Sequence, residues 1–219
     1  MQVQAQAKTQ VKICGINAPA AFDAAIGAGA DWIGFAFFPP SPRHVTPAQA
    51  ADLSARAPGG PLRVGLFVDP TPDLIAATLD IVGLDILQLY GALDLAMLRR
   101  RFGLPLWHAV GVATAADLPA SAGGADRLVI EAKPPPEATR PGGNAVSFDW
   151  SLLRGWTAPA PWILAGGLTV ANVATAIDVT RATAVDVSSG VERARGVKDP
   201  DLIRAFVAQA RAADESRAA

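Results

Sequence analysis

Short apolar segments that are typical of strands alternate with Ala-rich segments that are typical of helices along the whole of this chain. The strand candidates are mostly continuous apolar runs, as in a parallel sheet covered by helices. They lie at 11–14, 32–37, 62–68, 85–90, 105–110, 126–131, 161–165 and 184–188. The helix candidates lie at 18–28, 47–57, 72–82, 93–102, 114–121, 147–155, 169–178 and 199–213. The period is therefore one strand and one helix, repeated eight times.

Eight such units predict an α/β fold, a single (β/α)8 TIM barrel. Barrels of this kind typically have ~250 residues, so 219 residues leave room for short connections and no second domain. The alternative is a doubly wound open sheet, which usually has five or six strands. We expect a flexible N-terminal tail at 1–10, the barrel at 11–213 and a frayed C-terminus at 214–219.

The charge balance restricts the partners. Lys and Arg number 19 and Asp and Glu 20, for a net charge of -1, so there is no basic field to attract nucleic acid or anionic lipid. No apolar run approaches the ~18 residues that span a bilayer. We therefore expect no nucleic acid and no membrane as partners, but a small anionic metabolite.

The absence of a signal-peptide pattern and the single cysteine, Cys14, favour the cytoplasm. Two histidines and one thiol give no zinc-type ligand cluster, so no metal is expected.

The polar residues at the strand ends suggest where the chemistry lies. In a (β/α)8 barrel the active site is at the C-terminal ends of the strands. Side chains alternate along a strand, and four strands then carry polar pairs on one face: Lys12 with Cys14, Gln88 with Tyr90, Arg127 with Glu131, and Asp186 with Ser188. We expect all of these to face the barrel mouth. Salt-bridged packing is the alternative.

Two small-residue turns follow the seventh and eighth strand candidates, with Gly166-Gly167 in the first and Ser189-Gly190 in the second. Glycine lets backbone N–H groups approach a ligand closely, and the loops after strands seven and eight of such barrels frequently bind phosphate. We therefore predict a phosphate site there. A third pair, Gly142-Gly143, lies in the longest connection, 132–146, which could be a lid.

Cys14 ends the first strand candidate and precedes a glycine. One interpretation is a small buried hydrophobic residue. The other is a base or nucleophile, if a neighbouring cation lowers the thiol pKa from about 8.5. Lys12 is the candidate cation, although it could equally pair with Asp186 or Glu131.

Glu131 ends the sixth strand candidate after an apolar run. It is either solvated or held in the mouth, and the second environment would raise its pKa toward the range of a general acid. Arg43 lies on a Pro-stiffened loop and is either exposed or able to hold a carboxylate by a two-pronged hydrogen bond. His44 and His108 have no partner at catalytic or metal spacing, so we expect them to be structural.

A series of motifs occurs in order along nearly the whole chain after the first ten residues. They are Lys12-Ile13-Cys14-Gly15-Ile16, Phe38-Pro39-Pro40-Ser41-Pro42-Arg43, Gly65-Leu66-Phe67-Val68, Gln88-Leu89-Tyr90-Gly91, Gly142-Gly143 with Phe148-Asp149-Trp150, Leu164-Ala165-Gly166-Gly167-Leu168, and Asp186-Val187-Ser188-Ser189-Gly190-Val191-Glu192 with Gly196-Val197-Lys198-Asp199. With these motifs the chain resembles the phosphoribosylanthranilate isomerase family of tryptophan biosynthesis.

The resemblance implies a cofactor-free Amadori rearrangement of N-(5-phosphoribosyl)anthranilate to 1-(2-carboxyphenylamino)-1-deoxyribulose 5-phosphate. In that family an acid opens the sugar ring and the strand-one cysteine removes the proton from sugar C2. The resemblance makes Cys14 the base, Glu131 the acid and Arg43 the clamp on the anthranilate carboxylate. It places Tyr90 and Asp186 among the substrate-binding residues. The phosphate cradle then consists of Gly142, Gly143, Gly166, Gly167, Ser189 and Gly190.

Three positions depart from the family pattern. Glu131 stands where the family has an aspartate as the acid. Tyr90 stands in place of the histidine of the family's QLHG motif, and Asp69 stands in place of its common asparagine after strand three. A displacement of about 1 Å at a reacting group can cost ~100-fold in rate, so the added methylene of Glu131 matters. The alternative function is that of a divergent paralogue, which binds a phosphorylated aminosugar without this activity or acts on a related substrate. We expect a monomer or a homodimer.

Overall fold

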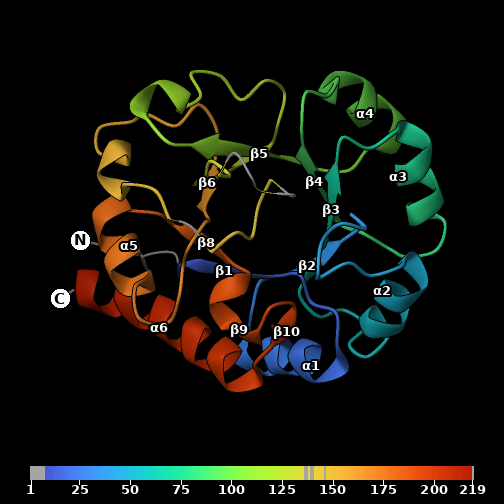
Figure 1. Ribbon diagram of the computed structural model, residues 1–219, viewed down its shortest axis with the longest axis horizontal. Coiled ribbons are helices and arrows are strands. Elements are labelled where there is room, and N and C mark those ends of the chain that lie inside the picture. Colours follow the sequence, from blue (N-terminus) through green and yellow to red (C-terminus); the bar gives the residue numbers. More distant parts are fainter. Residues whose placement is uncertain (1–7, 136–137, 139–140, 146, 219) are drawn as a thin grey trace, which may run out of the picture.

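The computed structural model describes residues 8–135, 138, 141–145 and 147–218, and its central feature is a closed parallel barrel. Eight strands are hydrogen-bonded in chain order, and β8 returns to pair with β1 (Figure 1). The strands are β1 Gln10–Cys14, β2 Trp32–Ala36, β3 Leu62–Val68, β4 Ile86–Tyr90, β5 Leu106–Val112, β6 Arg127–Ala132, β7 Trp162–Leu164 and β8 Ala184–Val187. The predicted barrel is confirmed, and the open sheet is excluded.

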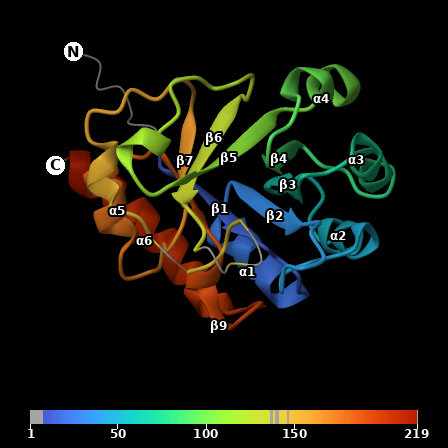
Figure 2. The ribbon, with the colours of Figure 1, turned by 45° about the horizontal axis from the view of Figure 1, so that its top comes forward.

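Helices surround the barrel in both ribbon views (Figures 1 and 2). They are α1 Pro19–Ala28, α2 Pro47–Ser54, α3 Pro72–Leu79, α4 Leu95–Phe102, α5 Val173–Thr180 and α6 Pro200–Ala218. Two of them begin in the same way, because Thr46 and Thr71 each accept a hydrogen bond from a first-turn backbone N–H and a proline follows each cap. Proline suits the first helical position, where no N–H partner exists.

Two predicted helices are wrong. Segments 114–121 and 147–155 contain only the short 3-10 turns η1 Ala115–Asp117 and η2 Trp150–Leu153. Pro119 lacks an N–H and stops η1, and Gly155 adopts a left-handed φ of 76° soon after η2.

The described ends of the chain are a strand and a helix. β1 begins at Gln10, and residues 1–7, most of the predicted tail, lie outside the described part of the chain. α6 runs from Pro200 to Ala218. A third 3-10 turn, η3 Ser189–Val191, leads into an unpredicted hairpin of β9 Glu192–Ala194 and β10 Val197–Lys198.

The core has two layers. The larger layer packs the outer faces of the strands against the helices, and a smaller one fills the barrel interior. Trp32 and Trp107 meet edge to face at 5.1 Å inside the barrel, and the Arg127 guanidinium lies 4.9 Å from the Trp32 ring. Trp32 and Arg127 are each the first residue of a strand, so Arg127 lies at the end of the barrel opposite its mouth. Its predicted place in the mouth is wrong.

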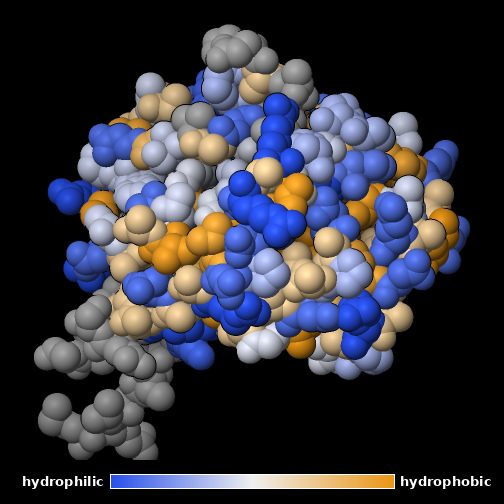
Figure 3. Space-filling model, turned by 60° about the horizontal axis from the view of Figure 1, so that its bottom comes forward, coloured by the Kyte–Doolittle hydropathy of each residue, from blue (hydrophilic) through white to orange (hydrophobic). Residues whose placement is uncertain are grey.

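The outer surface mixes hydrophilic and hydrophobic residues in the view of Figure 3. Among the described residues, no helix is both long and apolar enough to cross a bilayer.

Candidate active site

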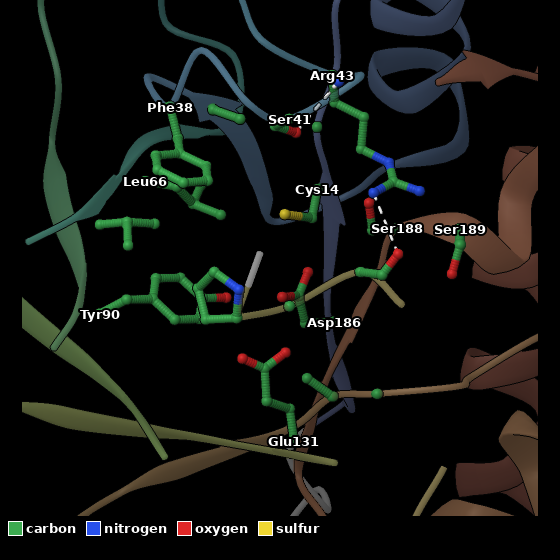
Figure 4. A pocket seen from close by; sticks show the side chains of 18 of the residues that line it. Cys14, Phe38, Ser41, Arg43, Leu66, Tyr90, Glu131, Asp186, Ser188 and Ser189 are labelled. Atoms are coloured by element: carbon green, nitrogen blue, oxygen red, sulfur yellow. Dashed lines mark hydrogen bonds between the residues drawn. The ribbon is translucent and has the colours of Figure 1, made fainter. Parts of the chain in front are cut away.

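A pocket opens at the C-terminal ends of the strands (Figure 4). The predicted site residues that line it are Cys14, Arg43, Tyr90, Glu131, Gly142, Gly143, Gly166, Gly167, Asp186 and Ser189. Of the predicted catalytic, substrate and phosphate residues, only Gly190 does not line it. Ser188 lines it as expected from side-chain alternation, and Phe38 and Leu66 are further lining residues that sequence reasoning did not place there.

Cys14 is the last residue of β1, and its sulfur points into the pocket (Figure 4). The side chain is nearly buried, and burial raises the thiol pKa while the charge of Lys12 lowers it. The cation is therefore present as expected, but burial has the larger effect. Cys14 is buried within the inner core cluster, as the first interpretation expects, and it also lines the pocket, as the second requires.

Lys12 lies below Cys14 on β1 and has no exposed surface. Its Nζ donates to Oδ2 of Asp186 on β8 at 2.9 Å, which identifies its partner among the open alternatives. Burial alone would lower the Lys12 pKa, but Asp186 and Cys14 raise it above its ordinary value. Lys12 therefore carries a positive charge under the pocket floor.

Glu131 on β6 is held in the mouth, with 6% of its surface exposed. Burial and then the charge of Asp186 raise its pKa from 4.5 to about 8, against the opposing effects of a hydrogen bond with Tyr90 and of Lys12. A carboxyl with this pKa keeps its proton at neutral pH, as a general acid requires. Glu131 and Asp186 thus differ in their surroundings, because only Asp186 has a direct cationic partner.

Tyr90 ends β4 beside Glu131. Its hydroxyl accepts a hydrogen bond at 3.1 Å from Nε2 of Gln88, which is fully buried. Burial and the charge of Glu131 raise the Tyr90 pKa well above 10, so this hydroxyl keeps its proton.

Arg43 already holds a carboxylate. Its Nε and Nη2 donate to the two carboxylate oxygens of Glu192 at 2.6 and 2.9 Å, and Nη1 donates to the carbonyl of Gly143 at 3.2 Å. The alternative of an exposed arginine is wrong, because Arg43 is 4% exposed. The two-pronged bond predicted for this arginine exists in the structure, but with a carboxylate of the protein.

Glu192 is the partner of Arg43, and sequence reasoning gave it no role in the site. Besides Arg43, it accepts from Nζ of Lys198 at 2.9 Å and from the backbone N–H of Gly196 at 3.0 Å. These donors hold the pKa of Glu192 at about 2, against the effect of its burial. Both Glu192 and Lys198 belong to the motifs quoted above. The sequence did not predict the hairpin that brings them into contact.

The two phosphate-loop candidates pack directly on each other. A Cβ atom on Gly190 would lie 1.8 Å from the carbonyl oxygen of Leu168, so only glycine fits between the loops. A Cβ atom on Gly167 would lie 2.6 Å from the backbone nitrogen of Ser147. Gly190 therefore brings the turns together, while Gly166, Gly167 and Ser189 present their surfaces to the pocket.

Asp69, the third departure, lies outside this pocket. It adopts a left-handed φ of 43°, and its carboxylate packs over Gly91 beside a neighbouring cavity. His44 and His108 contact the carbonyls of Ala36 and Gly91 through their rings, in keeping with structural roles. The lid candidate 132–146 is described only in part, because 136–137, 139–140 and 146 lie outside the described residues.

Comparison with known proteins decides the family. A model of N-(5'phosphoribosyl)anthranilate (PRA) isomerase matches residues 11–209. The chain belongs to the PRA isomerase family. A relative from Acidiphilium cryptum named N-(5'-phosphoribosyl)anthranilate isomerase is 56% identical, covering 93% of this chain and 99% of the relative, and one from Paracoccus denitrificans is 54% identical, covering 92% and 97%.

Solved PRA isomerase structures share the fold. The enzyme from Thermotoga maritima has a TM-score of 0.81 at 36% identity, covering 93% of this chain and 99% of that one. A PRA isomerase in complex with reduced 1-(o-carboxyphenylamino)-1-deoxyribulose 5-phosphate has a TM-score of 0.78 at 34% identity, with the same coverage. The predicted family, barrel and isomerase class are thereby confirmed.

Proposed function

We propose that this protein performs the Amadori rearrangement of N-(5-phosphoribosyl)anthranilate, a step of tryptophan biosynthesis, with Glu131 as the acid and Cys14 as the base. One observation carries the assignment of roles. One pocket is lined by a carboxyl on β6 that keeps its proton at neutral pH and by a thiol on β1 that lies beside a buried cation. The reaction needs one group of each kind.

Glu131 acts first. It donates its proton to the ring oxygen of the furanose, the bond from that oxygen to C1 breaks, and the nitrogen lone pair forms a C1=N iminium. The proton comes from a group whose pKa of about 8 suits proton transfer near neutral pH. Glu131 is left as a carboxylate, and the ring oxygen becomes a hydroxyl.

Cys14 acts second. Its thiolate removes the proton from C2, and the C–H electron pair forms a C1=C2 bond while the iminium becomes a neutral amine. The resulting enol loses its hydroxyl proton and C1 gains a proton, so a ketone forms at C2 and no atom is gained or lost. The positive iminium next to C2 favours the thiolate, which burial otherwise disfavours.

The glycine turns provide the anchor. Gly166, Gly167 and Ser189 line the pocket on the side of β7 and β8, where backbone N–H groups are able to bind the 5-phosphate without a lysine. Gly142 and Gly143 line it from the connection after β6. We place the anthranilate carboxylate at Arg43, where the carbonyl of Gly143 now accepts the Nη1 hydrogen bond and would have to yield it.

Rescue of a tryptophan auxotroph that lacks this isomerase tests the function. We expect growth with the natural protein and none with Cys14→Ala at equal expression. No growth with the natural protein, despite good expression, would overturn the proposal and favour a paralogue that binds a phosphorylated aminosugar or acts on a related substrate. We also place the protein in the cytoplasm, as a monomer or a homodimer, which cell fractionation and sedimentation velocity test.

A further inference from the structure

Tyr90 and Glu131 approach each other from the two strands that flank β5. Tyr90 ends β4, Glu131 lies on β6, and β5 runs between these strands. Both side chains line the same pocket at the mouth of the barrel.

The two oxygen-bearing groups converge on one point under the loop after β6. A Cβ atom on Gly142 would lie 2.7 Å from Oε2 of Glu131, 3.0 Å from its Oε1 and 2.9 Å from the hydroxyl oxygen of Tyr90. Gly142 therefore covers both groups at once, and the carboxyl has little freedom to turn away.

The hydroxyl of Tyr90 has a defined donor direction. Nε2 of the fully buried Gln88 donates to its oxygen at 3.1 Å, so the phenol proton remains for another acceptor. The carboxyl of Glu131 lies beside this hydroxyl under Gly142 and is the acceptor that the arrangement offers. Gln88, Tyr90 and Glu131 then form a chain of donors that ends on the catalytic acid.

From this geometry we infer that Tyr90 is a positioning residue for Glu131: its hydroxyl fixes the carboxyl toward the pocket. Tyr90 does not itself transfer the proton. The inference rests on the proposed function for its kinetic consequence, because Glu131 must be the acid for its position to affect turnover. An aspartate at 131 has one methylene fewer, which draws its carboxyl back from Tyr90, so we assign the contact to the glutamate.

A double-mutant cycle tests the inference. Tyr90→Phe keeps the ring and removes the hydroxyl, and we expect kcat to fall about tenfold with KM within twofold. In a Glu131→Asp background the same change should cost less than threefold, because the contact is already lost. Thr78→Val removes a buried hydroxyl of α3, which donates to the Leu74 carbonyl at 2.8 Å, and serves as the matched control with kcat unchanged. Equal losses from Tyr90→Phe in both backgrounds would overturn the inference.

A second measurement uses neither turnover nor a substitution at Tyr90. Tyr90 is the only tyrosine of the chain, so 2-fluorotyrosine incorporated during expression gives a single ¹⁹F resonance. We expect this resonance to titrate with the pKa of Glu131, near 8, and to lose that titration in Glu131→Gln. A resonance that stays constant from pH 6 to 9, or titrates equally in Glu131→Gln, would refute the contact. If the natural protein has no isomerase turnover, the proposed function fails, while this titration still decides the contact.

Discussion

The pH dependence of stability provides the sharpest physical test of Glu131. Its pKa is raised from 4.5 to about 8 in the folded protein, so the folded state binds this proton more tightly than the unfolded state does. The stability contributed by the neutral carboxyl is therefore fully present below about pH 4.5 and is lost as the pH rises through about 8. Glu131→Gln keeps the shape of the neutral acid but cannot ionise.

The size of this stability change follows from the linkage between proton binding and folding. Each pKa unit corresponds to ~1.4 kcal/mol, so the free energy of unfolding of the natural protein should decrease relative to that of Glu131→Gln by up to ~1.4 kcal/mol per pH unit. Between 4.5 and about 8 the total approaches about 5 kcal/mol. Urea denaturation of both proteins at pH 5, 6, 7, 8 and 9 measures the difference, and groups shared by the two proteins cancel.

The result that would refute this reasoning is a constant difference. If the two free energies of unfolding stay parallel within about 0.5 kcal/mol from pH 5 to 8, then Glu131 is ionised in the folded protein at neutral pH. It would then not be the proton donor that opens the sugar ring.

Three further predictions concern the site and its supports. Glu192→Gln leaves the buried cations Arg43 and Lys198 without their carboxylate, and should lower the free energy of unfolding by about 3–5 kcal/mol in chemical denaturation. Asp178→Asn, in an exposed ion pair, is the control and should change that free energy by less than about 1 kcal/mol. Gly190→Ala would place a Cβ atom 1.8 Å from the Leu168 carbonyl oxygen, and should destabilise the protein by about 1–3 kcal/mol and raise KM; an unchanged KM would contradict the phosphate assignment. Glu131→Gln should abolish turnover in a steady-state assay whereas Glu131→Asp retains it, and full activity of Glu131→Gln would remove Glu131 from the mechanism.

The barrel and the location of the pocket were predictable because they depend on a repeated pattern. The apolar strand runs set the order of the sheet, and side-chain alternation placed Cys14, Tyr90 and Glu131 correctly at the mouth. Arg127 shows the limit of alternation. It shares a face with Glu131, but it lies at the other end of β6, where it covers Trp32.

The role of Arg43 could not be obtained from the sequence, because its partner Glu192 is 149 residues away. That contact depends on how the hairpin of β9 and β10 folds, and segment 192–198 has no alternating apolar pattern that would predict two strands. The protonation of Glu131 was likewise undecided, because it depends on burial and on Asp186 from a strand elsewhere in the barrel.

The most direct test of the account is a crystal structure with reduced 1-(o-carboxyphenylamino)-1-deoxyribulose 5-phosphate, the compound bound in a related enzyme. We predict the phosphate at the turns of Gly166 and Ser189, Sγ of Cys14 within ~3.5 Å of C2, and the carboxyl of Glu131 within hydrogen-bond distance of the oxygen on C4. A complex in which Asp186 instead of Glu131 contacts that oxygen, or in which Cys14 lies away from C2, would contradict the assignment of acid and base.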